Sequence, residues 1–429
     1  MPVFHSNRPC SWLVITTLAM LATAPIDARE FTLEAAMEKV AKVHPQLRVF
    51  ESRLRLLEAE ADTAMLPPGF RVDADIENFA GEGAYAGTSQ AEYTLTLAGV
   101  LERGMKREAR RAVAAGRIDA LGVERAVAEL DLLAEVNRRY LDWVEASLAP
   151  SLTARARDDH QSLVQVMHRV HRHGGVSQAV VLAAEAENAR LLLEHEQSVR
   201  DSQLAWQRLA LLWGDAGTSD PAPAFTSLPQ NLPDLVSLPD MLDKIRRLPD
   251  IEYFASVQRI QESELHLIEL ERRRDVEWRL GLRRLQGDSA TAIVAGLSIP
   301  LGQSSRLALR TAAERARQES LFFEKNTRLQ SLETVLIRMY GEAERERHRL
   351  LMLDEQVLPR LRNATEQGVQ ALQSGALSYM ELGQMRRELW VAEKDRLTAQ
   401  VNFYRSLVEL QRLTTELWSS SNKSNGAQQ

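Results

Sequence analysis

"FRVDADIENF", Phe70 to Phe79, decides the architecture that this sequence predicts, because its polar and apolar side chains alternate at a period of two. The apolar positions are Val72, Ala74 and Ile76, and the charged positions are Arg71, Asp73, Asp75 and Glu77. Alternation of this kind predicts a β-strand with one polar face and one apolar face. Because most of the remaining chain has helical periodicity, this short strand needs a role that helices do not fill.

The composition is that of an ordinary protein of one to three domains. The chain has 429 residues, 26% of them charged, and a formal net charge of -6 at pH 7. No basic stripe is interleaved with aromatic residues, so no nucleic-acid partner is predicted. The sequence also lacks a P-loop, a dinucleotide fingerprint and a zinc-protease helix. We therefore expect no enzymatic activity, no catalytic residues and no cofactor.

Residues 1–28 have the layout of a secretory signal peptide. Arg8 precedes an apolar run over residues 12–22, and small residues follow that run. Cleavage is expected after Ala28, with Ala24 as the alternative site, whereas a membrane anchor would need a longer apolar run. The single cysteine, Cys10, lies inside this leader. An exported chain without disulfides points to a bacterial envelope protein.

Two halves of the sequence repeat one another. "HPQLRVFESRL" from His44 returns as "LPDIEYFASVQRI" from Leu248, and "HGGVS" from His173 returns as "SGALS" from Ser374. We expect a first unit over 29–213, a Pro-rich linker over 214–237, a second unit over 238–418 and a disordered tail over 419–429. Strands are expected near 70–79 and 92–99 in the first unit, and near 275–285 and 292–300 in the second.

The other segments predict very long helices that lie side by side. Residues 101–172 and 305–373 are each expected to form one helix, and residues 379–418 the last one. A helix of ~70 residues is about 105 Å long, far longer than a compact domain. Heptad spacing, typical of knobs-into-holes packing, is kept by Leu332, Leu336, Ala343, Leu350, Leu382, Leu389, Phe403 and Leu410. The fold class is therefore mainly α with a small β part, built as duplicated antiparallel helical hairpins.

The strands predict a transmembrane β-barrel that several chains share. The stretch from Val276 to Leu282 repeats the alternation of the first strand, and no helix is left over to cover the apolar faces. Strands with an apolar outside, a polar inside and aromatic ends fit a barrel in lipid, although two exposed hairpins are the alternative. Four strands are too few to close a barrel, so chains must pool them. The residues expected to face the lumen are Arg71, Asp73, Asp75, Glu77, Glu277, Arg279 and Arg283.

The sequence resembles the TolC family of outer-membrane efflux channels over residues 31–418. The similarity rests on "FTLEAAMEKVAKVHPQLR" from Phe31, "LTLAGVLERGMKR" from Leu95, "LSIPLG" from Leu297 and "QVLPRLRNATEQGVQALQSGALSYMELGQMRREL" from Gln356. The pattern is most similar to the heavy-metal, CzcC-type branch. The resemblance implies that three chains with four strands each make one barrel, and that their helices continue as an α-helical tunnel.

This resemblance also implies a place and partners for the protein. It implies a homotrimer in the outer membrane of a Gram-negative bacterium, in contact with outer-membrane lipid and extending into the periplasm. The implied protein partners are a periplasmic adaptor (membrane fusion) protein and an inner-membrane transporter of the RND type. The implied function is the exit channel of a tripartite efflux system, whose cargo is a heavy-metal cation, an organic compound or a polypeptide. A soluble or peripheral coiled-coil adaptor without a channel is the alternative.

The turns between the long helices are where the resemblance places the adaptor. Gly174, Gly175 and Ser177 lie in the first turn, and Gly375 and Ser378 lie in the second. The glycines allow a tight reversal of the chain between packed helices. These residues are therefore expected to contact the adaptor, and a simple turn without a partner is the alternative.

Glu381 is the residue that the resemblance places at the pore gate, facing the tunnel at its narrowest point. Three such carboxylates around the axis would attract cations and raise their own proton affinity. Gln384 stands where a second acidic residue is often found, so the constriction is expected to be less charged than in relatives that carry both. A solvated glutamate on the outer face is the alternative.

A cluster of histidines near the first turn is the weak candidate for a metal site. It consists of His160, His168, His171 and His173. His168 and His171 lie one helical turn apart, a spacing that suits zinc. A solvated helix end is the favoured explanation of the cluster, so no firm metal site is predicted.

Overall fold

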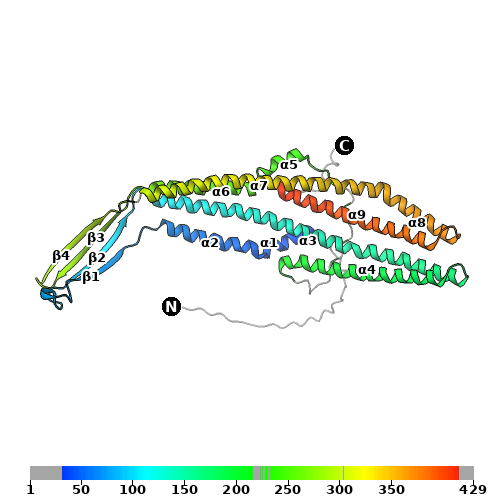
Figure 1. Ribbon diagram of the computed structural model, residues 1–429, viewed down its shortest axis with the longest axis horizontal. Helices are drawn as coiled ribbons and strands as arrows, with labels where there is room; N and C mark the ends of the chain where they lie inside the picture. The colour runs from blue at the N-terminus through cyan, green and yellow to red at the C-terminus, as the bar shows by residue number, and fades with distance from the viewer. Residues whose placement is uncertain are drawn as a thin grey trace, which may run out of the picture.

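The computed structural model describes residues 31–215, 223, 225, 228–229, 232–302 and 304–414. The expected signal peptide and C-terminal tail lie outside these residues, as does part of the expected linker. Within the described ranges, the chain is mainly helical with one small sheet (Figure 1). No helix in these ranges is both long enough and apolar enough to cross a membrane.

The molecule is elongated, with the sheet at one end and, at the other, the two turns that connect α3 to α4 and α8 to α9 (Figure 1). α3 alone has 67 residues, which makes it about 100 Å long. Short 3-10 turns lie at Gly83–Tyr85 and Leu211–Trp213. The helices are α1 (Leu33–Val43), α2 (Pro45–Met65), α3 (Lys106–Arg172), α4 (Gln178–Ala210), α5 (Leu238–Ile245), α6 (Pro249–Glu271), α7 (Ser304–Met352), α8 (Leu358–Gln373) and α9 (Tyr379–Thr414).

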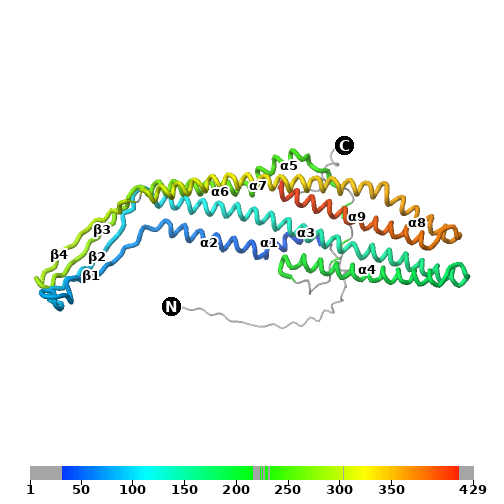
Figure 2. The backbone as a smooth tube through the Cα atoms, in the orientation of Figure 1, coloured from blue at the N-terminus to red at the C-terminus, as the bar shows by residue number. Residues whose placement is uncertain are grey.

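The strands form one antiparallel sheet in the order β1-β2-β3-β4. β1 spans Arg71–Glu77, β2 spans Glu92–Leu101, β3 spans Val276–Leu285 and β4 spans Ala290–Ser298. All four strands that the alternation predicts are therefore present. Figure 2 shows that each pair of strands leaves the helical body and returns to it, since α2 leads to β1, β2 to α3, α6 to β3 and β4 to α7.

The heptad positions of the last long helices form the main hydrophobic core. α7 and α9 bury most of these positions against one another in a single cluster, which confirms the predicted seam. The heptad residues in this cluster are Leu332, Leu336, Ala343, Leu350, Phe403 and Leu410. α5 closes over the same cluster through Met241 and Ile245. The core is thus a seam along helices and not a compact centre.

One predicted helix boundary is wrong and one predicted helix contains an interruption, and both departures have local causes. The first long helix begins at Lys106 because β2 continues to Leu101, and Gly104 and Met105 then turn the chain with φ values of 90° and 58°. In the second half, the predicted single helix is divided by a π-helical turn over Leu353–Val357. Pro359 follows this turn at the start of α8, and its missing N–H interrupts the hydrogen-bond ladder.

Candidate functional site

One face of the sheet carries the polar residues of the strands. Residues that pair across an antiparallel sheet share a face, and the register pairs Asp75 with Thr94 and Thr94 with Arg283. The same register brings to this face every residue that the sequence predicts in a lumen: Arg71, Asp73, Asp75, Glu77, Glu277, Arg279 and Arg283. The two halves of the sequence therefore build one continuous polar surface.

Arg283 connects three strands on this polar face. Its guanidinium donates to the Glu92 carboxylate at 2.9 Å and to Thr94 Oγ1 at 3.0 Å. It also lies 3.0 Å from the Glu77 carboxylate of β1. These contacts depend on the register between β2 and β3, so the alternation within single strands could not reveal them.

The apolar face of the sheet is exposed, while on the polar face the threonines of β2 are sheltered and charged residues such as Asp75 and Arg279 stay exposed. In β2, the side chains of Leu95 and Leu97 keep 58% and 42% exposure, whereas Thr94 and Thr96 keep 5% and 7%. A protein that folds in water shows the reverse order. The exposed apolar surface continues over the sheet through Val72, Ile76, Tyr93, Leu280, Leu282, Ile293 and Leu297. The sheet is therefore inverted relative to a water-soluble one.

Aromatic side chains lie at both ends of the strands. At the end next to the helices, the rings of Phe70 and Trp278 lie 6.1 Å apart with an edge-on geometry. A Cβ atom on Gly99 would lie 2.9 Å from the Trp278 indole, so the glycine makes room for that ring. Phe79 and Tyr93, near the opposite end, are both exposed.

The first turn at the far end of the helices is a Schellman motif between α3 and α4. The Gly175 N–H donates to the Val170 carbonyl at 3.0 Å, and the Gly174 N–H donates to the His171 carbonyl at 2.8 Å. Gly174 has a φ of 76°, a conformation that costs glycine little. Ser177 then stands at the N-cap of α4 without a side-chain capping bond.

The second turn, between α8 and α9, repeats the two Schellman bonds of the first. The Ala376 N–H donates to the Ala371 carbonyl at 2.9 Å, and the Gly375 N–H donates to the Leu372 carbonyl at 3.1 Å. Gly375 has a φ of 77°. The similarity of the two sequence halves thus extends to individual hydrogen bonds, and Ser378 occupies the position that Ser177 has in the first turn.

The two turns are held together by a shared apolar cluster. It includes side chains of α3, α4 and α9, so the tips do not splay apart in the single chain. Its buried members are Leu163, Met167, Val181, Ala184, Tyr379 and Leu382. We call the two turns and this cluster the tip region.

Glu381 and Ser378 cap the N-terminus of α9 reciprocally. The Ser378 N–H and hydroxyl donate to Glu381 Oε2 at 2.9 and 2.7 Å, and the Glu381 N–H donates to Ser378 Oγ at 3.3 Å. This is a capping box, which the spacing Ser-x-x-Glu would have revealed in the sequence. The bonds from the Ser378 side chain and backbone lower the pKa of Glu381, in the direction opposite to the rise expected from a ring of carboxylates. Glu381 therefore caps α9 in the structure, and its role at the gate stays a prediction.

His168 and His171, the candidate zinc ligands, contact different partners. His168 Nε2 lies 3.0 Å from the Glu185 carboxylate, and His171 Nδ1 lies 2.8 Å from the Val176 carbonyl. Across the residues that the structure describes, no three histidine, cysteine or acidic side chains gather in an arrangement suited to a metal ion.

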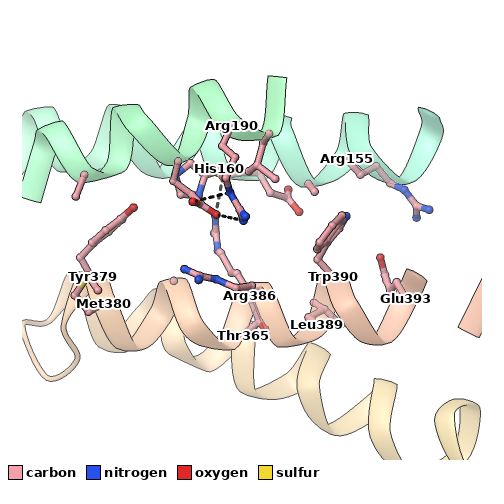
Figure 3. A pocket seen from close by; sticks show the side chains of 17 residues that line it. Arg155, His160, Arg190, Thr365, Tyr379, Met380, Arg386, Leu389, Trp390 and Glu393 are labelled. Carbon is pink, nitrogen blue, oxygen red and sulfur yellow. Dashed lines mark hydrogen bonds and ion pairs between the residues drawn. The ribbon is translucent and has the colours of Figure 1, made fainter. Parts of the chain in front are cut away.

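A polar cavity of about 370 Å³ lies between the two hairpins behind the tip region (Figure 3). Its walls come from α3, α4, α8 and α9. His160 lines it, with Nε2 3.1 Å from the Ala184 carbonyl, and burial lowers the pKa of this imidazole. Sequence reasoning missed the cavity because its residues are distant from one another along the chain.

The sequence matches no protein-family model and no curated protein. The structure, in contrast, is similar to solved outer-membrane proteins over nearly its whole length. The outer-membrane channel OprN matches with a TM-score of 0.72 and 20% identity, covering 92% of this chain and 94% of that one. The chain has the fold of an outer-membrane channel.

Two further solved structures lead to the same conclusion about the fold. The outer membrane protein VceC from Vibrio cholerae matches with a TM-score of 0.71 and 16% identity, covering 89% of this chain and 96% of that one. The Campylobacter jejuni CmeC outer membrane channel matches with a TM-score of 0.70 and 12% identity, covering 96% and 93%. Because these matches cover 89% or more of each chain, the sheet, the helical body and the tip region are shared as one architecture.

Proposed function

We propose that this protein is a homotrimeric outer-membrane channel and serves as the exit duct of a tripartite efflux system in a Gram-negative bacterium. The observation that carries the proposal is the inverted sheet, whose leucine face is exposed and whose threonine face is sheltered. Lipid is the solvent that this arrangement fits, with the charged face turned to a water-filled lumen.

The need for other copies follows from the open edges of the sheet. β1 and β4 each have a neighbour on one side only, and unpaired backbone groups are not tolerated in hydrocarbon. Three chains that pair β4 of one copy with β1 of the next would leave no open edge. The structural likeness to solved outer-membrane channels supports this arrangement. The lumen would then be lined by the seven predicted lumen residues and by Glu92, which lies on the same face.

We assign the partners from the resemblance of the sequence to the TolC family. A periplasmic adaptor would dock at Gly174, Gly175, Ser177, Gly375 and Ser378 of the tip region, and an inner-membrane transporter of the RND type would supply the energy. The channel itself needs no catalytic group and no cofactor. Heavy-metal cations are the cargo class to test first, because the sequence is most similar to the heavy-metal branch.

The proposal is tested by locating the protein and recording its conductance. The full chain should fractionate with outer membranes, migrate on unheated gels as a trimer that heating dissociates, and open ion-conducting pores in planar bilayers. A chain that stays in the periplasmic fraction as a coiled-coil scaffold, without pore activity, would overturn the channel in favour of the adaptor alternative.

A further inference from the structure

The carboxylates around the cavity between the hairpins are largely occupied by partners. Glu187 pairs with Arg190 at 2.8 Å, and Glu393 pairs with Arg362 at 3.0 Å. Asp159 is the remaining carboxylate of the lining, and it forms no ion pair within the described ranges. Two of the three carboxylates that line the cavity are therefore neutralised by arginines.

The arginines around the same cavity are not balanced in this way. Arg155 donates to the Ser151 carbonyl at 3.3 Å, and Arg386 donates to the Asp159 carbonyl at 2.7 Å. Arg387 has neither a hydrogen bond nor an ion pair with any residue in the described part of the chain. Three guanidinium groups from α3 and α9 therefore face the cavity without a carboxylate partner from that part of the chain.

Arg386 is the most sheltered of these three arginines. Burial lowers the pKa of this guanidinium, and its hydrogen-bond acceptor is a neutral backbone carbonyl. A guanidinium carries five N–H donors, so several donors remain available. The nearby charge of Asp159 offsets part of the burial cost of Arg386, but the two side chains form no ion pair, so an anion between the hairpins would stabilise the guanidinium further.

The cavity also offers an aromatic wall to the body of a ligand. Tyr379 and Trp390 rise from α9 toward the opposite hairpin (Figure 3). Lys394 Nζ lies 5.3 Å from the centre of the Trp390 ring, which adds a further cation near this wall. A volume of about 370 Å³ is in the range of small-molecule sites.

We propose that this cavity binds a small molecule bearing a carboxylate or a phosphate, with the oxyanion between Arg386 and Arg387 and the body of the molecule against Trp390. Guanidinium groups recognise both oxyanions through the same paired hydrogen bonds. The site goes beyond the channel function and does not depend on it, since a chain that failed to conduct would still bind.

The test is a titration of the purified full chain, followed by tryptophan fluorescence and by melting temperature. One arm uses inorganic phosphate and the other uses benzoate, each at ionic strength held constant with sodium chloride, so that general screening does not change. Benzamide, which has the shape of benzoate without its charge, is the control ligand. We expect saturable binding of at least one anion, no binding of benzamide, and a rise in melting temperature with anion concentration. The Trp390→Phe variant should lose the fluorescence response and keep the thermal one.

Single-residue variants test whether anion binding depends on the arginines of the cavity or only on the net charge of the protein. Arg387→Gln and Arg386→Gln should each weaken anion binding about tenfold or more, because each removes charge-assisted hydrogen bonds. Arg315→Gln on α7 removes the same charge at an exposed position far from the cavity and should bind like the wild type. Arg387 is exposed, so its variant should fold even if the Arg386 variant does not.

The phosphate and benzoate titrations together show which class of oxyanion the cavity binds. Binding of phosphate alone would assign the site to phosphates, and binding of benzoate alone would assign it to organic carboxylates. The proposal fails if neither anion saturates, if benzamide binds as well as benzoate, or if Arg387→Gln and Arg315→Gln bind equally.

Discussion

The Asp250 carboxylate lies 2.9 Å from the Arg412 guanidinium, and both side chains are buried, with exposures of 2% and 8%. Arg328 of α7 also donates to Asp250, and Arg412 donates to Asp131 of α3 at 2.7 Å. Asp250 lies in the first turn of α6, where the helix dipole favours a negative charge. One buried carboxylate thus connects α6, α7 and α9, and Arg412 extends the connection to α3.

Replacing Asp250 by Asn is expected to destabilise the protein by about 3–5 kcal/mol, because Arg412 is left buried without its full counter-charge. The matched control is Asp234→Asn. Asp234 pairs with Arg347 at 2.7 Å, but its side chain is 92% exposed, and exposed pairs contribute about 0–1 kcal/mol. Chemical unfolding, followed by the circular dichroism of the helices, measures the free energy of unfolding of both variants. Similar losses in the two variants would mean that burial of the pair is unimportant.

The same pair predicts a loss of stability in acid. Burial alone would raise the pKa of Asp250, but hydrogen bonds and charge from Arg412 and Arg328 outweigh it and lower the pKa. A carboxylate whose pKa is lower in the folded state contributes stability above its unfolded pKa, about 3.9. That contribution is lost as the pH falls through the folded value. The difference in melting temperature between the wild type and Asp250→Asn should therefore be constant near neutral pH and narrow below about pH 4.

The apolar face of the sheet predicts sensitivity to charge. Ile76→Arg and Leu280→Arg, both on that face, should each cost about 2–4 kcal/mol if they lie near the bilayer midplane. The trimeric fraction on unheated gels of outer-membrane extracts measures the effect. We expect a clear loss of trimer for both variants.

Substitutions on the polar face provide the control for the lipid assignment. Asp75→Asn and Arg279→Gln lie on the side that we assign to the lumen, so assembly should be unchanged. Arg283 is unsuitable as a control because it holds Glu77 and Glu92. Equal loss of trimer in the apolar-face and polar-face variants would rule out the barrel.

Much of the fold was predictable because it follows from periodicity within single segments. The alternation in Phe70 to Phe79 predicted β1, and heptads such as Leu336, Ala343 and Leu350 predicted the buried seam of α7. The errors arose where the chain departs from a regular period. The left-handed Met105 delays the start of α3, and the π-turn before Pro359 divides α7 from α8.

The candidate site was less predictable because it depends on contacts between segments. Arg283 reaches Glu77 only through the register of β1, β2 and β3, and the arginines of the cavity meet only when α9 packs against α3 and α4. The capping bond of Glu381 is local and was visible in the sequence. The roles proposed for the lumen residues, the tip region and the gate remain predictions.

The tip region is expected to contact a periplasmic adaptor. A photo-crosslinker at Ser177 should capture the adaptor, and this position is suitable because Ser177 makes no side-chain capping bond. Ser378 is less suitable, since its hydroxyl caps α9. A crosslinker at Glu319, on the sheet-proximal half of α7, is the control and should capture nothing. Formation of the complex without any crosslink from Ser177 would contradict docking at the tips.

The proposed gate is best tested by variants that separate the charge of Glu381 from its capping bonds. Gln at the third helical position still completes a capping box, so Glu381→Gln removes the charge and keeps the cap. Glu381→Ala removes both and should cost roughly 0.3–1.5 kcal/mol of local helix stability. If Glu381 faces the pore, both variants should lose cation selectivity and block by multivalent cations in single-channel recordings.

The pH dependence of that block provides an independent measurement. The hydrogen bonds from Ser378 lower the pKa of Glu381, whereas three converging carboxylates would raise it, so these bonds should keep the charge, and the block that depends on it, to a lower pH than the ring would have without them. In a Ser378→Ala trimer these bonds are reduced, the pKa should rise, and the block should disappear at a higher pH than in the wild type. Unchanged selectivity and block in Glu381→Gln would show that the carboxylate serves only to cap α9, and that the constriction is formed by other residues.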